Sequence, residues 1–292
     1  MDFLVIGGDA AGMSAASRAK RNRPDLTVTV LEKTGDVSYS ACGMPYNIAD
    51  PERPIDDLVV RRAEVFRDKQ GIDLLTGIEA TALDPSARTV SARDAEGRER
   101  VFPYDKLLLA TGARPLRPAL PGMDLPGVMV LKSLSDGRAL KRFLARKAVK
   151  RAVIIGMGYI ALEMCEALRG RGIAVDMIKH RKTFLPWMAE RLAQQVRSEV
   201  EAHGVGVHAG YAVERIEADG EGLAVIAQDL TLRGDLVIVA VGVAPASELA
   251  AAAGLKTSVQ GAVAVDARQR TSDNAIFAAG DCADAFHVVT GR

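Results

Sequence analysis

The sequence feature that most constrains the fold is an apolar strand that runs into a glycine-rich turn and then into a helix. The first copy has a strand at Phe3–Ile6, a turn at Gly7–Gly12, a helix at Gly12–Arg21 and a further strand at Thr27–Leu31. Glycines let such a turn bend tightly, and the N-terminus of the helix that follows attracts a pyrophosphate. The pattern therefore predicts a βαβ unit that binds a dinucleotide.

The same order recurs later in the chain. A strand at Ala152–Ile155 runs into a turn at Gly156–Ala161, a helix at Ile160–Arg169 and a strand at Ala174–Ile178. The second turn has both leading glycines and an alanine in third place. Two such units in one chain are far more specific than one, so we expect an α/β fold with two Rossmann-like dinucleotide-binding domains.

Further strands mark the domain organisation. Apolar runs at Lys106–Ala110, Leu236–Ala240 and Ala275–Ala279 each end in a turn that contains glycine. A chain of 292 residues is long enough for two domains. We place the boundaries so that residues 1–116 and 245–292 form the first domain, and residues 117–244 form a second domain inserted into it.

The first turn has one departure from the dinucleotide pattern. Glu32 follows the second strand, where a carboxylate can hold a ribose 2′-hydroxyl. Asp9, however, stands where the central glycine belongs, and its charge would repel a pyrophosphate unless it points away. The alternative interpretation is a glycine-rich turn without a ligand.

The second unit carries a basic cluster after its second strand. Lys179, His180 and Arg181 occupy the place where an acidic residue would select NADH. Cations there suit a 2′-phosphate, which favours NADPH over NADH. A solvated basic turn is the alternative.

One of the three cysteines has the context of a reactive thiol. Cys42 is followed by Gly43 and, three residues on, by Pro45, which predicts the start of a helix whose dipole favours a thiolate. Asn47 stands where a C-x-x-x-x-C pair would have its second cysteine, so the thiol would work alone, in a mixed disulfide or as a sulfenic acid. A buried, inert cysteine is the alternative. Cys165 and Cys282 are expected to be packing residues.

Composition excludes several classes of function. The net charge of +1 gives no general attraction to nucleic acid, and the chain lacks the run of about 18 apolar residues that a membrane span needs. Three scattered cysteines make no disulfide framework, and Met1–Ile6 enters the first turn without a signal-peptide pattern. We expect a cytoplasmic protein with no metal site.

The combination resembles the pyridine nucleotide-disulfide oxidoreductases. More narrowly, it resembles the single-cysteine branch that contains coenzyme A-disulfide reductases, NADH oxidases and NADH peroxidases. The resemblance covers the whole chain and rests on the following stretches: Gly7–Gly12, Glu32-Lys33, Ser38–Tyr46, Ala110–Ala113, Gly156–Glu163, Val241-Gly242 and Ala278–Asp281.

The resemblance implies two cofactors and their contacts. FAD would bind the first domain through Gly7, Gly8, Ala10, Ala11, Gly12, Glu32, Lys33, Ala80, Ala110, Thr111, Gly112, Lys132, Gly280 and Asp281. NADPH would bind the second through Gly156, Gly158, Tyr159, Ile160, Glu163, Lys179, His180, Arg181 and Gly242. Cys42 would be catalytic, and Tyr159 would gate the nicotinamide face of the flavin.

The substrate is inferred from residues that separate members of the branch. Oxidases and peroxidases carry a histidine in the first turn, where this chain has Ala10, and the Cys-Gly-Met-Pro-Tyr run looks like that of the CoA-disulfide reductases. A basic edge could meet the phosphates of CoA, and it comprises Arg18, Lys20, Arg21 and Arg23, with Arg61, Arg62 and Lys69. The positions that match the family's CoA contacts are Ser14, Arg18, Arg21, Ser38 and Lys69.

The sequence thus predicts an FAD-dependent NAD(P)H oxidoreductase that reduces CoA disulfide, or a CoA persulfide or polysulfide, through Cys42. The alternatives are an NAD(P)H oxidase or peroxidase that uses a Cys42 sulfenic acid, and a non-catalytic nucleotide-binding fragment. Family members continue into a C-terminal dimer-interface domain that we expect to be absent from these 292 residues. With that domain present, we expect a homodimer.

Overall fold

The computed structural model describes residues 1–285 and 289, and it divides into two compact units. Unit 1 comprises residues 1–40, residues 59–114 and the chain from residue 244 onward; unit 2 comprises residues 41–58 and 115–243. Unit 2 is therefore inserted into the chain of unit 1. The segment 41–58, which we had assigned to the first domain, is instead grouped with unit 2.

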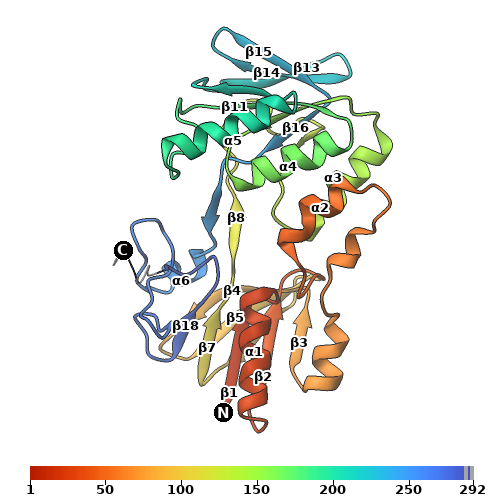
Figure 1. The fold of residues 1–292 in the computed structure, drawn as a ribbon. Coiled ribbons are helices and arrows are strands. Elements are labelled where there is room, and N and C mark those ends of the chain that lie inside the picture. Colours follow the sequence, from red (N-terminus) through yellow and green to blue (C-terminus); the bar gives the residue numbers. More distant parts are fainter. Residues whose placement is uncertain (286–288, 290–292) are drawn as a thin grey trace. The chain divides into compact units, whose positions relative to one another are not determined.

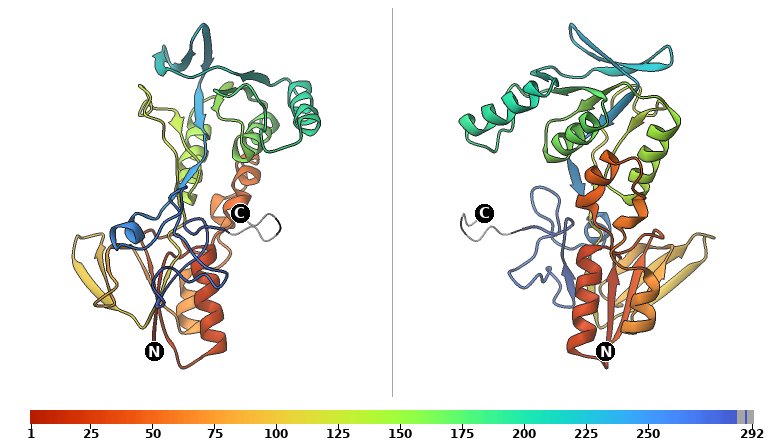
Figure 2. Two further views of the ribbon diagram at one scale, coloured as in Figure 1. Left: turned by 90° about the vertical axis from the view of Figure 1, so that its left-hand side faces the viewer. Right: turned by 45° about the vertical axis from the view of Figure 1, so that its right-hand side comes forward.

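Unit 1 is built on a parallel five-stranded sheet with the order β18-β7-β1-β2-β3. Its strands are β1 (Asp2–Ile6), β2 (Thr27–Glu32), β3 (Asp73–Thr76), β7 (Lys106–Leu109) and β18 (Ile276–Ala278). Helix α1 (Ala10–Asn22) connects β1 to β2 and lies along one face of the sheet (Figures 1 and 2). The expected βαβ unit is present with its ends shifted by one or two residues.

Apolar side chains alternate across this sheet and bury both of its faces. Leu4 and Ile6 of β1 belong to one core cluster, and Val5 between them belongs to another. Successive side chains of a strand point to opposite faces, so an uninterrupted apolar run marks a strand that is covered on both sides.

The remaining elements of unit 1 surround the sheet. An antiparallel sheet of β4 (Ile78–Asp84), β5 (Thr89–Asp94) and β6 (Glu99–Pro103) packs through β4 against α6 (Glu248–Ala252). A short π-helical turn spans Val65–Lys69 before β3. The boundaries between the units fall within β8 (Ala113–Pro115) and β17 (Val243–Pro245).

Unit 2 repeats the architecture around a parallel sheet with the order β12-β11-β10-β16-β9. Its strands are β9 (Val128–Met129), β10 (Arg151–Ile155), β11 (Ala174–Lys179), β12 (Gly206–Ala209) and β16 (Leu236–Val239). Helices α4 (Tyr159–Gly170) and α5 (Glu190–Ala202) pack against β11 and β12, respectively. A second antiparallel sheet contains β13 (Arg215–Asp219), β14 (Gly222–Ala227) and β15 (Leu230–Gly234).

The segment 41–58 belongs to unit 2 because its helix is held there. It contains a 3₁₀ turn (Ala41–Gly43), α2 (Met44–Ala49) and a second 3₁₀ turn (Ile55–Leu58). Helix α2 packs against α4 and against α3 (Leu134–Arg146). Lys141 of α3 donates hydrogen bonds to Asn47 O (2.9 Å), Asn47 Oδ1 (3.0 Å) and Asp50 O (2.8 Å), and Arg171 donates to Ile48 O at 2.8 Å. Two cations thus satisfy carbonyls at the C-terminal end of α2, where they also oppose the helix dipole.

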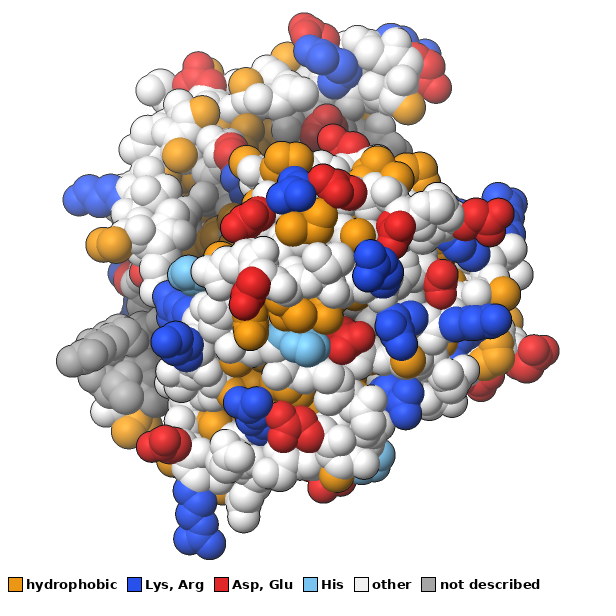
Figure 3. Space-filling model, turned by 90° about the horizontal axis from the view of Figure 1, so that it is seen from above, with side chains coloured by type: hydrophobic (Ala, Val, Ile, Leu, Met, Phe, Trp, Pro, Cys, Tyr) orange, Lys and Arg blue, Asp and Glu red, His pale blue; other side chains and the backbone are white. Residues whose placement is uncertain are grey.

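The two antiparallel sheets had no counterpart in the sequence-based prediction of parallel α/β layers. None of the helices in the described part of the chain has the length and apolar character that a bilayer crossing requires. On the face drawn in Figure 3, Lys and Arg are interspersed with Asp and Glu, and neither sign gathers into a continuous patch.

Candidate functional site

The first glycine turn is set by contacts that leave no room for side chains. Gly7 has φ +112°, and a Cβ added there would lie 2.1 Å from Ala110 O. A Cβ on Gly12 would lie 1.9 Å from Gly7 O. The turn is tied to both neighbouring strands, because Gly7 N donates to Leu31 O and Ala110 N donates to Ile6 O, each at 2.8 Å. Glycine is required at both positions by the protein's own backbone.

The structure shows where the charge of Asp9 goes. Its Oδ1 accepts a hydrogen bond from Tyr39 N at 3.2 Å, and Ser38 N donates to Gly8 O at 3.0 Å. The carboxylate is therefore directed to the segment that follows β2.

A pocket of about 550 Å³ lies within unit 1 beside this turn. Five of the residues expected to bind FAD line it: Gly7, Glu32, Lys33, Ala80 and Thr111. The carboxylate at its edge is fixed, because Glu32 Oε2 accepts from Gly8 N at 2.8 Å and Oε1 accepts from Thr34 N at 2.8 Å. The Thr111 hydroxyl donates to Ala246 O.

The last glycine turn of unit 1 meets the first. Gly280 has φ +82°, and a Cβ added there would lie 2.9 Å from the Ala11 Cβ. Ala279 N donates to Leu109 O at 3.0 Å, so β18 delivers Gly280 and Asp281 to the same end of the sheet as the first turn. Two stretches almost 270 residues apart in the sequence, which the resemblance assigned to one cofactor, therefore adjoin within unit 1.

The other expected FAD contacts are distributed differently. Gly8 lies in the turn between β1 and α1, Ala10, Ala11 and Gly12 form the start of α1, and Ala110 and Gly112 follow β7. Lys132 belongs to unit 2, where its backbone N–H donates to Asp136 Oδ2 at 3.0 Å just before α3.

The second glycine turn lines a larger pocket, of about 690 Å³, within unit 2. Eight of the nine residues expected to bind NADPH line it: Gly156, Gly158, Tyr159, Ile160, Lys179, His180, Arg181 and Gly242. Gly156 has φ +124°, and a Cβ there would lie 2.1 Å from Ala240 O. At Gly158, in contrast, an added Cβ would meet no atom within 4 Å.

The ninth residue, Glu163, is not brought to this pocket. Glu163 lines a different cavity, between α4 and α5, together with Cys165 and His203. Tyr159 and Ile160 at the start of α4 line the pocket beside the glycine turn, whereas Glu163 lies about one helical turn further along. At that position its side chain faces the cavity between α4 and α5. The structure therefore groups Glu163 with a different set of residues from the other eight.

The cations of the second pocket differ in exposure. Lys179 is half-buried and donates through Nζ to Thr183 O at 2.9 Å. Burial, followed by the charge of Arg181, lowers the pKa of Lys179. His180 and Arg181 are exposed at the pocket, where their side chains can meet an anionic group.

An aromatic residue that the sequence analysis missed also lines this pocket. Trp187 lies in the connection between β11 and α5, and its ring contacts the Tyr159 ring with centroids 5.2 Å apart and planes inclined by 47°. Both rings are largely exposed, Tyr159 at 64% and Trp187 at 51%. The available signal was that this is the chain's single tryptophan and that it lies outside any apolar strand or helix.

The three cysteines differ sharply in exposure. Cys42 is exposed in the 3₁₀ turn that precedes α2, whereas Cys165 and Cys282 are buried. Burial raises the pKa of Cys165 to about 11. Cys282 is fully enclosed and directs its Sγ to Leu109 O and Ala279 O, each at 3.4 Å. Cys42 is thus the one cysteine whose thiol solvent and reagents can reach.

Asn47 lies inside unit 2 and has no free face. Its side chain is fully buried, its Nδ2 donates to Pro54 O at 2.8 Å, and its Oδ1 accepts from Lys141. No group of His, Cys, Asp and Glu side chains suited to a metal ion occurs within residues 1–285 and 289.

The residues expected to bind CoA all belong to unit 1. Ser14, Arg18 and Arg21 are exposed on one face of α1, and Lys69 is exposed at the end of the π-helical turn. Ser38 has φ +48°, a left-handed conformation, and precedes the residue that binds Asp9.

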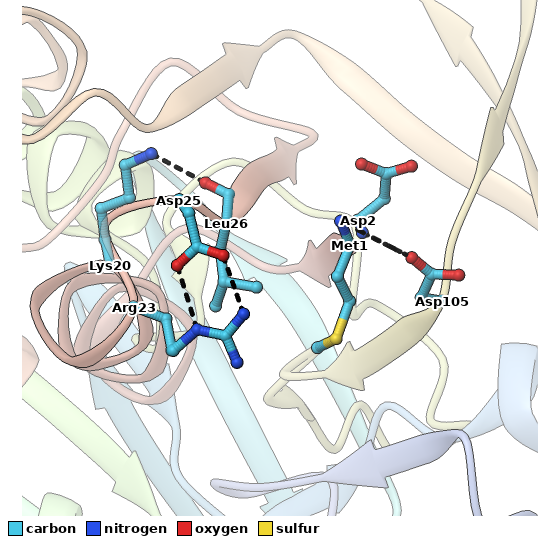
Figure 4. A network of polar contacts seen from close by, with 7 residues as sticks. All are labelled: Met1, Asp2, Lys20, Arg23, Asp25, Leu26 and Asp105. Carbon is cyan, nitrogen blue, oxygen red and sulfur yellow. Dashed lines mark hydrogen bonds and ion pairs between the residues drawn. The ribbon is translucent and has the colours of Figure 1, made fainter.

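Two other cations of the basic edge are already engaged. Figure 4 shows Lys20 reaching Leu26 O at 2.7 Å and Arg23 forming two hydrogen bonds with Asp25. Arg18 and Arg21 make no ion pair with other described residues. These two arginines therefore carry the charge that remains available on this helix.

The two units define a protein with two Rossmann-like dinucleotide-binding domains, one of which is inserted into the chain of the other. The family model of the pyridine nucleotide-disulphide oxidoreductases matches residues 1–291, and the chain belongs to this family.

Three similar proteins illustrate the range of activities among its relatives. An NAD(P)H sulfur oxidoreductase (CoA-dependent) from Pyrococcus abyssi is 36% identical over 99% of this chain and 64% of its own length. An NADH oxidase from Methanocaldococcus jannaschii is 32% identical over 100% of this chain and 65% of its own length. The solved structure of an NAD-dependent persulfide reductase from A. fulgidus superposes with a TM-score of 0.95 at 35% identity, over 100% of this chain and 55% of that one. The chain thus spans less than two thirds of the length of these relatives.

Proposed function

We propose that this chain is the two-cofactor part of an FAD-dependent NAD(P)H oxidoreductase that reduces CoA disulfide, or a CoA persulfide, through Cys42. The observation that carries the proposal is the single exposed thiol, in a chain with a lined pocket beside each of its two glycine turns. The CoA-dependent sulfur oxidoreductase and the persulfide reductase among the relatives support this substrate class.

The residues of unit 1 fit FAD. The first glycine turn packs too closely for side chains at Gly7 and Gly12, the Asp9 carboxylate accepts a hydrogen bond from Tyr39 N, and Gly280 adjoins Ala11. Glu32 and Lys33 at the pocket edge would hold the adenosine ribose, and Asp281 the ribityl and pyrophosphate region. When bound, FAD supplies two-electron transfer between a nicotinamide and a disulfide.

The residues of unit 2 fit a nicotinamide dinucleotide, and we propose NADPH. Arg181 presents a positive charge at the pocket beside the imidazole of His180, and Lys179 lines the same pocket. A hydrogen bond between charged groups contributes about 1.5–3 kcal/mol, so two contacts to a 2′-phosphate correspond to roughly a hundredfold or more in affinity. Similar proteins include one named for NADH and one named for NAD(P)H. We therefore expect these side chains, and not the fold, to determine which of the two nucleotides binds.

Cys42 performs the disulfide chemistry. Its thiolate attacks one sulfur of CoA disulfide, forms a Cys42–S–S–CoA mixed disulfide and releases one CoA thiolate. Two electrons and a proton then cleave the mixed disulfide, which releases the second CoA thiol and restores the Cys42 thiolate. Arg18 and Arg21 would hold CoA phosphates, with Ser14, Ser38 and Lys69 as further contacts.

An anaerobic titration of the purified chain with NADPH tests the proposal. We expect bleaching of a bound flavin band, followed by release of CoA thiol when CoA disulfide is added. Cys42→Ser should keep the bleaching and lose the thiol release, whereas Cys165→Ser should keep both. Thiol release by Cys42→Ser at the parent rate would remove the basis of the assignment.

A second candidate is an NAD(P)H oxidase or peroxidase that cycles Cys42 through a sulfenic acid, and it is favoured by the NADH oxidase among the relatives. Ala10 argues against this candidate, because the oxidases and peroxidases of the branch carry a histidine at this position of the first turn. Consumption of hydrogen peroxide or oxygen at a higher kcat/KM than CoA disulfide, in a protein that also carries the C-terminal region, would decide for the oxidase or peroxidase.

A further inference from the structure

We propose that Trp187 is a ring-stacking residue of the dinucleotide site in unit 2, and that it binds NADH and NADPH alike. The inference rests on the proposed dinucleotide binding by this unit and goes beyond it, because it assigns a contact that neither the glycine turn nor the basic cluster contains.

The connection that carries Trp187 is built to present the indole ring. Phe184 and Leu185 are buried, at 6% and 2% exposure, and anchor the segment in unit 2. Met188 N donates to Leu185 O at 3.0 Å and closes a turn around Trp187, and Leu185 has φ +47°, which is costly for a residue with a side chain. These anchored residues precede Trp187 and leave the indole outside the core.

The indole is placed where a planar ligand would meet it. It tilts against Tyr159, the first residue of α4, and both rings line the same pocket as Gly158 and Arg181. Each of the two residues exposes more than half of its surface, although large aromatic side chains usually gain from burial. A pair of partly exposed rings beside a cationic edge matches a ligand that combines heteroaromatic rings with phosphates.

The stacking contact should not depend on the 2′-phosphate. Base–aromatic stacking is tolerant of the particular base and is lost on replacement by alanine. Trp187→Ala should therefore raise the Kd of NADPH and of NADH by a similar factor, on the order of tenfold. Arg181→Ala, in contrast, should raise mainly the Kd of NADPH and so change the ratio of the two.

The test measures binding and not turnover. The Kd values of NADPH and NADH are determined by equilibrium dialysis for the parent chain, Trp187→Ala, Trp187→Phe and Leu192→Ala. Leu192 is a matched control, because it is a large apolar residue of α5 with 50% exposure and is not among the pocket's lining residues. We expect the alanine variant at position 187 to lose affinity for both nucleotides, and the phenylalanine and Leu192→Ala variants to stay close to the parent.

Intrinsic fluorescence gives a second measurement on the unaltered chain. Because the chain has one tryptophan, its emission reports only this position. Quenching should saturate with NADPH at the Kd found by dialysis. Unchanged Kd values in Trp187→Ala, a change confined to NADPH, or emission that does not respond to bound NADPH would each overturn the proposal. If the parent chain binds neither nucleotide, the proposed function of unit 2 fails as well, which distinguishes that outcome from failure at Trp187 alone.

Discussion

Gly156 and Gly158 are two residues apart in one turn, yet the structure predicts opposite consequences for their replacement by alanine. At Gly156 the new Cβ would lie 2.1 Å from Ala240 O, on a backbone with φ +124°. Overpacking costs about 1–3 kcal/mol, and a backbone conformation reserved for glycine costs about 1–3 kcal/mol. Gly156→Ala should therefore lose roughly 2–6 kcal/mol of stability, which lowers the Tm by roughly 5–20 °C for a chain of this class.

Gly158→Ala should leave the fold almost unchanged. Its backbone, φ −87° and ψ −173°, suits any residue, and the added Cβ would meet no atom within 4 Å. Loss of the glycine N-cap lowers the free energy of unfolding by up to about 1 kcal/mol. The alanine also restricts the unfolded chain, which raises the free energy of unfolding by about 0.4–1 kcal/mol. The methyl group would instead occupy the space where a pyrophosphate approaches the backbone. Losing one charge-assisted hydrogen bond of about 1.5–3 kcal/mol corresponds to a roughly ten- to hundredfold higher Kd for NADPH.

Thermal unfolding and equilibrium dialysis with NADPH check both expectations. Gly170→Ala is a matched control, since Gly170 lies at the other end of α4 and also has no atom within 4 Å of its added Cβ. This control should keep the parent Tm or exceed it slightly, with unchanged affinity. A Gly158→Ala variant that melts as early as Gly156→Ala, or that binds NADPH as the parent does, would refute the argument that ligand space, and not protein packing, requires this glycine.

Four further predictions concern other residues. At pH 8 a thiol reagent should label Cys42 in the folded chain and reach Cys165 only after unfolding. Because burial raises the pKa of Cys165 from 9.0 to about 11, its contribution to stability is present below pH 9 and is lost as the pH rises toward 11, which urea unfolding at a series of pH values would detect. Lys141→Met should cost about 1–3 kcal/mol in urea unfolding, because it leaves the half-buried Asn47 carbonyl and the Asn47 side-chain oxygen without their donor, whereas Met in place of the exposed Arg142 should cost little; equal losses would contradict this. Arg18→Ala should raise the KM for CoA disulfide at nearly constant kcat, with an effect that shrinks as salt is added, and a KM that is insensitive to both would count against a phosphate contact.

Seven strands of the two parallel sheets could be predicted to within about one residue, whereas the short strands β3, β9 and β12 at the sheet edges were not predicted. Strands that are buried on both faces appear in the sequence as continuous apolar runs. In β1 and β10, the run ends at the first glycine of the turn that follows. The observed β1, β2, β10 and β11 start or end within about one residue of the predicted ranges. The antiparallel sheets escaped prediction because a strand such as Arg215–Asp219 is mostly polar and exposed, so its pattern does not differ from that of a loop.

Site residues whose identity is set by local backbone geometry could be predicted from the sequence. Residues whose position depends on contacts with distant parts of the chain could not. Gly7 and Gly156 are glycines because a carbonyl of a neighbouring strand occupies the Cβ position, and the motif records that constraint directly. The direction of the Asp9 carboxylate depends on Tyr39 N, thirty residues away, and could not be read from the turn alone. Trp187 carried no motif, so its place in the pocket emerged only from the fold.

Because segment 41–58 is attached to unit 2, it determines which residues must be exchanged together when unit 2 is replaced by that of a relative. A chimera that exchanged residues 115–243 alone for the corresponding part of a relative would keep α2, with Cys42 in the turn before it, from one parent and the Lys141 and Arg171 donors from the other. The two pieces have to be inherited together, although more than fifty residues of unit 1 separate them in the sequence. For recombination, the natural unit of exchange is therefore discontinuous, and Cys42 is inherited with unit 2 and not with the residues of unit 1 that flank it in the chain.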